Sequence, residues 1–178
     1  MIVSAAWQNR RMRKSRSLAL AAILALASTS AWAVGSLSKG LCHKSETTYF
    51  SCQTSKQRRI ALCGSPPKTL QYRFGREDHP EFVFPQNASE GLEKFLFAHY
   101  ARYRADRIEI RFSNRDVDYT IFSYLENGSH NAGVHVTTPE GKEHEFICED
   151  KVTLRLIELK EVLSCDAESA LTAGNCPP

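Results

Sequence analysis

The stretch RIEIRFSNRDVDYTIFSY, residues 107–124, carries a strong two-residue periodicity. Ile108, Ile110 and Phe112 fall on one side of an extended backbone, and charged side chains fall on the other side. The polar residues 113–116 then turn the chain into a second strand-like run at 117–124. This stretch therefore predicts two antiparallel strands, each with one apolar face.

Shorter runs of the same kind lie on both sides of this hairpin. Residues 47–52 and 58–63 predict a second hairpin, joined by a polar connection. Further strands are expected at 70–74, 81–84, 134–136 and 143–148, and the segment ENGSHNAG at 126–133 is expected to be a loop. Short strands of this number and spacing are typical of a small antiparallel barrel or sandwich.

Two segments have apolar residues at helical spacing instead. Ser89 is a suitable N-cap for a helix over residues 90–103. Asp150 is a suitable N-cap for an amphipathic helix that ends at Leu163, with further apolar residues at Val152, Leu156 and Leu159. The predicted fold is therefore mainly β, with a C-terminal amphipathic helix.

The first 33 residues have the parts of a secretory signal peptide. Five basic residues between positions 10 and 16 precede the apolar run LALAAILALA, and Ala31 and Ala33 stand where a signal peptidase requires small residues. We expect cleavage after Ala33, which leaves one disulfide-bonded globular domain over 34–178 without a stable membrane anchor. The signal segment removes five basic and no acidic residues, so the remaining domain is slightly acidic, which argues against nucleic-acid binding.

All six cysteines lie in the part that remains: Cys42, Cys52, Cys63, Cys148, Cys165 and Cys176. An even number in an exported chain predicts three disulfides and a periplasmic or secreted location. Three cysteines lie toward each end of the domain, so at least one bridge must join the two ends. Cys52 and Cys148 both continue the apolar faces of their strands, which favours a bridge between them, together with Cys42–Cys63 and Cys165–Cys176.

Metal and cofactor motifs are not found. The cysteine spacing contains no C-x-x-C pair, and no phosphate-binding or dinucleotide fingerprint occurs. A tight turn at residues 138–142 would place His135 opposite Glu145 and His144 on the other face as a semi-buried packing residue, so the two histidines would not share a metal. We therefore expect neither metal nor cofactor.

Two groups of residues are candidates for binding. Arg104, Arg107 and Arg111 belong to a basic stretch with aromatic residues between them, of the kind that docks an acidic protein cleft, although the same residues could be an ordinary solvated strand face. Asn127, Ser129 and His130 lie in the expected loop, and polar loops on a rigid β scaffold often carry binding. No catalytic residues are assigned.

The pattern Phe50-Ser51-Cys52, Cys63 and Tyr72-Arg73-Phe74-Gly75 resembles that of a group of small exported bacterial proteins of unknown function. A more distant resemblance is to periplasmic inhibitors of c-type lysozyme, which are small disulfide-bonded β-barrels. The Ser-Gly loop motif with which those inhibitors enter the lysozyme cleft has no equivalent in this chain, so the resemblance carries no inhibitory residues across.

Together these observations predict an exported binding protein of the cell envelope rather than an enzyme. Its partner would be another envelope or secreted protein, and the specific hypothesis is an inhibitor or immunity protein against a wall hydrolase or toxin. One alternative is an envelope-acting hydrolase that uses Glu77, Asp78 and His79. The other is a structural component of the envelope.

Overall fold

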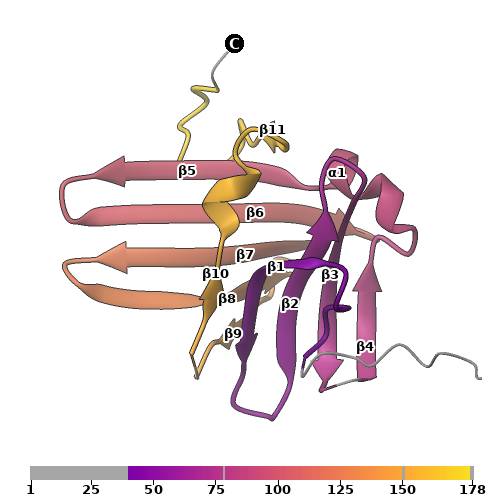
Figure 1. The fold of residues 1–178 in the computed structure, drawn as a ribbon. Helices are drawn as coiled ribbons and strands as arrows, with labels where there is room; N and C mark the ends of the chain where they lie inside the picture. Colours follow the sequence, from indigo (N-terminus) through magenta and orange to yellow (C-terminus); the bar gives the residue numbers. More distant parts are fainter. Residues whose placement is uncertain (1–39, 78, 150, 177–178) are drawn as a thin grey trace, which may run out of the picture. The chain divides into compact units, whose positions relative to one another are not determined.

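The computed structural model describes residues 40–77, 79–149 and 151–176. The expected signal peptide at 1–33, together with Asp78 and Asp150, lies outside the described residues. Within the described residues the chain forms two β-sheets, whose strands run in clearly different directions (Figure 1).

The first sheet is antiparallel and has the strand order β10-β1-β2-β3-β4. Its strands are β1 (Thr47–Gln53), β2 (Arg59–Ser65), β3 (Thr69–Arg76), β4 (His79–Phe84) and β10 (Thr153–Leu154). Four of these strands were predicted from periodicity, but β10 was not. It pairs with β1 through Phe50 opposite Leu154, so a segment from near the C-terminus completes the N-terminal sheet.

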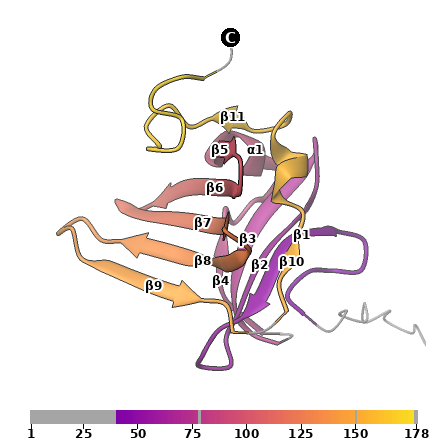
Figure 2. The same ribbon diagram turned by 90° about the vertical axis from the view of Figure 1, so that its left-hand side faces the viewer.

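The second sheet has the order β11-β5-β6-β7-β8-β9. Its strands are β5 (Leu96–Arg102), β6 (Ala105–Asn114), β7 (Val117–Glu126), β8 (Ser129–Thr137), β9 (Glu143–Ile147) and β11 (Ser164–Cys165). All neighbours are antiparallel except β11, which runs parallel to β5. Figure 2 shows the long strands β6 to β9 stacked one below the other.

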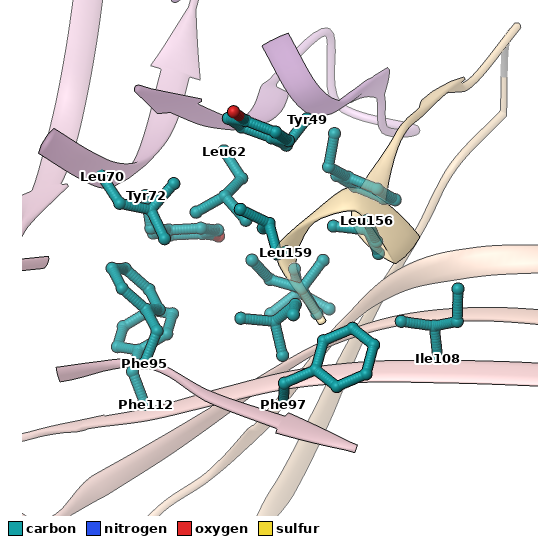
Figure 3. Packing of buried hydrophobic residues seen from close by; sticks show 14 of the residues in the cluster. Tyr49, Leu62, Leu70, Tyr72, Phe95, Phe97, Ile108, Phe112, Leu156 and Leu159 are labelled. Carbon is teal, nitrogen blue, oxygen red and sulfur yellow. The ribbon is translucent and has the colours of Figure 1, made fainter. Parts of the chain in front are cut away.

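The core is formed between the inner faces of the two sheets. Leu62, Leu70 and Tyr72 of the first sheet face Phe112 of the second sheet and Phe95, which directly precedes β5 (Figure 3). All five side chains are almost fully buried. Burial of so many large apolar side chains is the main source of stability, at about 1.5 to 3 kcal/mol for each one.

The expected C-terminal amphipathic helix over 150–163 is wrong. Thr153 and Leu154 extend the first sheet, and only Leu156–Leu159 form a helical turn, of the 3₁₀ type. Leu156 and Leu159 are nevertheless fully buried and enter the core between the two sheets (Figure 3). The apolar positions were therefore identified correctly, but their spacing fits a strand followed by a tight turn as well as it fits a helix.

The expected helix over 90–103 is also mostly wrong. A 3₁₀ turn at Ala88–Glu90 leads into the short helix α1 (Gly91–Lys94), and the chain then enters β5. Phe95 and Phe97 are two residues apart and both are buried, so the period of two describes this segment better than the helical period. Gly91 lies against β3, where an added Cβ would meet the carbonyl oxygen of Leu70 at 1.9 Å.

Two further expectations need correction. The described residues form two open sheets and no closed barrel. The expected loop over 126–133 is mainly strand, because β7 and β8 are joined by only two residues, Asn127 and Gly128. Both have the positive φ angles that a tight two-residue hairpin turn requires.

The three disulfides are Cys42–Cys63, Cys52–Cys148 and Cys165–Cys176, the pairing that the sequence favoured. Cys52 belongs to the main core, whereas Cys42 and Cys63 form a separate small cluster with Leu41 and Ala61 on the opposite face of the first sheet. With no free cysteine in the described part of the chain, the disulfides indicate an oxidising, exported location. No helix among the described residues is long and apolar enough to cross a bilayer.

An arginine network holds the N-terminal segment on the outer face of β3. Arg73 donates to both carboxylate oxygens of Glu46, at 2.6 and 2.7 Å, and to the carbonyl oxygen of Leu41 at 2.9 Å. A fourth hydrogen bond joins Arg73 to the amide oxygen of Gln71. Burial alone would raise the pKa of Glu46, but the hydrogen bonds from Arg73 and from the His43 main chain lower it below the ordinary 4.5.

This network predicts a specific acid sensitivity. Because the folded pKa of Glu46 lies below the unfolded value, its carboxylate contributes stability above pH 4.5 that is lost as the pH falls through the folded pKa. We expect the free energy of unfolding, measured in urea at a series of pH values, to fall less steeply in acid for Glu46→Gln than for the wild type. Equal acid dependence of the two proteins would contradict this assignment.

Candidate binding surface

Five of the six candidate binding residues lie together at one end of the second sheet. Arg104 is at the turn between β5 and β6, and Asn127 is at the turn between β7 and β8, both on the left in Figure 1. The N–H of Asn127 donates to the carbonyl oxygen of Arg104 at 2.9 Å, so the two hairpin tips are fixed to each other. Arg107, Ser129 and His130 are on the strands that follow these turns, β6 and β8.

We call this region the hairpin-tip surface and define it by its exposed or partly exposed residues: Tyr100, Arg102, Tyr103, Arg104, Arg107, Leu125, Asn127, Ser129 and His130. Tyr103 is 89% exposed at the tip itself, between two exposed arginines. Tyr100 and Leu125 add exposed apolar area on opposite faces of the sheet, because Tyr100 lies on the face of Arg107 and Tyr124, and Leu125 follows Tyr124 along β7. Tyrosine and arginine dominate the binding energy of many protein interfaces, so this composition suits a contact surface.

The charges on the hairpin-tip surface are unevenly balanced. Arg107 forms an ion pair with Glu126 and lies over the Tyr124 ring, 5.4 Å from its centroid. Arg102 and Arg104, by contrast, have no acidic partner among the described residues. When the neighbouring Asp106 and Glu126 are counted together with Arg102, Arg104 and Arg107, this end of the sheet has a net charge of +1, which suits an acidic partner.

Arg111, the sixth candidate, has a structural role. Its guanidinium binds both carboxylate oxygens of Asp166, at 2.6 and 2.7 Å, and also binds Glu168. The Asp166 side chain is only 2% exposed, so the pair fixes the C-terminal segment to the outer face of the second sheet. These hydrogen bonds raise the pKa of Arg111. Arg111 is therefore not available to a partner in the way that Arg104 is.

The histidine pairing agrees with the predicted register. His135 lies opposite Glu145, with its Nε2 atom 2.6 Å from the carboxylate, and stacks on the buried ring of Phe122. His144 is on the other face, but it is exposed rather than semi-buried because β9 is the last strand of its sheet. Within the described ranges, no three His, Cys, Asp or Glu side chains converge as metal ligands.

The residues of the alternative hydrolase hypothesis lie at the turn between β3 and β4. Glu77 and His79 are both exposed there, and Asp78 lies outside the described residues. Glu77 lines an open pocket with Gln53, Gln57, Arg59 and Arg76, and His79 is not among its lining residues.

Sequence reasoning missed an apolar cleft between the two sheets. Tyr72, Phe74 and Phe82 line it from β3 and β4, and Tyr119, Val136 and Phe146 line it from β7, β8 and β9. Its volume is about 320 Å³. The alternation of Leu70, Tyr72 and Phe74 was visible in the sequence, but it predicted only a strand with one apolar face and not a cleft.

Models of protein families, curated proteins and solved structures were compared with the chain, and none of them matches it.

Proposed function

We propose that the chain is a periplasmic or secreted binding protein that recognises an acidic surface of another protein through the hairpin-tip surface. The observation that carries the proposal is the position of Tyr103, which is exposed between two arginines at a tip that the neighbouring hairpin holds in place. A surface fixed before binding loses little conformational freedom on association.

The partner that fits this chemistry is an enzyme with an acidic cleft, such as a wall hydrolase or a toxin. Hydrolases of glycans commonly place two carboxylates in the cleft that binds the substrate. An arginine-flanked tyrosine would complement such a cleft by its charge and by its flat apolar ring. This complementarity of charge and shape supports an inhibitor or immunity role.

The test uses the oxidised protein as bait for an envelope extract and for a panel of purified lysozymes, with captured enzymes then measured directly. We expect Tyr103→Ala and Arg104→Glu each to weaken the affinity by about tenfold or more, because each removes a central contact. We also expect the association rate of the wild type to fall as salt is added.

Arg115→Glu is the matched control. Arg115 is an exposed arginine with a positive φ angle in the turn between β6 and β7, at the opposite end of the same sheet. The Arg115→Glu substitution should leave the affinity for the captured protein unchanged. Equal weakening by Arg115→Glu and Arg104→Glu would show only a general charge effect, and retention of anionic glycan without any protein would overturn the proposal.

A further inference from the structure

Among the residues that the structure describes, β9 has a neighbouring strand on one side only, so it forms an open edge of the second sheet. The N–H of Thr138 donates to the carbonyl oxygen of Lys142 at the β8–β9 turn, and the N–H of Cys148 donates to the carbonyl oxygen of Ala132 at the other end of β9. Between these two points, residue pairs that exchange hydrogen bonds alternate with pairs that do not. In that pattern Glu143 and Glu145 belong to the pairs that exchange no hydrogen bonds with β8. Their N–H and C=O groups therefore point away from the sheet, at its open edge.

A groove runs beside this edge. Its lining includes His144, Glu145 and Phe146 of β9 on one side, and Lys56 and Arg58 of the β1–β2 hairpin on the other. Its volume is about 570 Å³, and it adjoins the apolar cleft described above, because Phe74 and Phe146 line both. A strand added to β9 would therefore direct alternate side chains past Phe146 toward the cleft.

The cleft also contains polar groups that have no partner. Tyr72 is only 3% exposed, and its hydroxyl, like that of Tyr119, has no hydrogen bond among the described residues. Among the described residues, every fully buried side-chain oxygen has a hydrogen-bond partner. Because the Tyr72 hydroxyl has none, it must be in contact with solvent, and Tyr72 lines the cleft, through which solvent reaches it. Burial raises the pKa of Tyr72, so it remains a neutral donor.

The charges on β9 argue against a second copy of the same chain as the added strand. Glu143 has no partner in the described part of the chain, and the carboxylate of Glu145 is held by His135. Two β9 strands placed side by side would bring like charges together, which disfavours pairing. A strand with lysine or arginine on its outer face would instead pair with Glu143.

We propose that β9 accepts an extended segment of a partner protein as an additional strand, with alternate apolar side chains entering the aromatic cleft and a basic side chain opposite Glu143. Hydrogen bonds to the open edge would supply affinity, and the cleft would supply specificity. This site is separate from the hairpin-tip surface and does not depend on the function proposed for it.

The test selects displayed random peptides of about ten residues against the oxidised protein, which suits a strand-addition site. We expect the enriched peptides to alternate apolar residues and to include lysine or arginine. Their affinity should fall about tenfold or more for Phe146→Ala and for Glu143→Pro, and less for Glu143→Gln. The Glu143→Pro change removes an outward N–H without breaking a hydrogen bond to β8.

Two controls keep the result interpretable if Glu143→Pro disturbs the fold. Tyr103→Ala should leave peptide affinity unchanged, because it alters only the hairpin-tip surface. An enriched peptide is also made in two N-methylated forms, blocking either one set of alternate amides or the other, and only one form should lose binding. Failure to enrich any peptide, equal binding of the two methylated forms, or sensitivity to Tyr103→Ala instead of Phe146→Ala would each overturn the proposal.

Discussion

Replacing Cys52 and Cys148 together with alanine is expected to lower the free energy of unfolding by about 4 to 5 kcal/mol. The bridge spans 96 residues and joins β1 of the first sheet to the end of β9 in the second. Without it, the unfolded chain gains the freedom of a long open loop. Both sheets depend on this contact, since Cys52 is fully buried in the core.

The measurement is urea or guanidinium unfolding of the oxidised variant against the wild type. The Cys165→Ala, Cys176→Ala double variant is the matched control, because its bridge spans only 11 residues and lies at the end of the chain. Its loss should be smaller, about 3 kcal/mol on the same loop-closure argument. If the short-loop variant loses as much stability as the long-loop variant, loop closure is not the cause.

Arg73→Met is expected to be the second most damaging change, with a loss of about 3 to 5 kcal/mol. Methionine keeps the apolar stem of the side chain but removes all the donors that bind Glu46, Leu41 and Gln71. The side chains of Arg73 and Glu46 are only 6% and 13% exposed, so the carboxylate would remain poorly solvated without its partner. Breaking one side of such a pair costs far more than breaking a pair on the surface.

Arg76→Met is the control on the same strand. Arg76 has a 69% exposed side chain and lies 3.8 Å from Glu81, so its loss should change the free energy of unfolding by less than about 1 kcal/mol. A second variant, Arg73→Met with Glu46→Leu, should recover much of the lost stability because it removes the unpaired carboxylate. No recovery would mean that the network stabilises the fold by another route.

The sequence predicted the strands well because the alternation of apolar residues is local. Residues 107–124 form β6 and β7 with the expected turn at Arg115 and Asp116. The helix prediction failed at Leu154, because this residue lies in β10. That strand is formed by pairing with β1, about one hundred residues earlier in the chain. Local spacing contains no information about such a partner.

The same limit explains the outcome for the candidate sites. Arg104 and Asn127 come together because two neighbouring hairpins have nearly equal lengths, which the strand boundaries alone could have indicated. Arg111 is not part of that group, because its guanidinium is bound to Asp166, which lies 55 residues later in the chain. The apolar cleft was not predictable, because Phe82 and Tyr119 meet there only when the two sheets pack.

The spacing of the cysteines gives the Cys52–Cys148 bridge a further consequence. Cys42 and Cys63 are each within 11 residues of Cys52, whereas Cys148 lies 96 residues away, so two nearer thiols compete with Cys148 for Cys52 while the bridges form. Pairing of β1 with β2 prevents the wrong bridges, because it directs Cys52 to one face of the sheet and Cys63 to the other. The β1–β2 hairpin therefore separates Cys52 from Cys63, and we expect the native disulfides to form after these strands have paired.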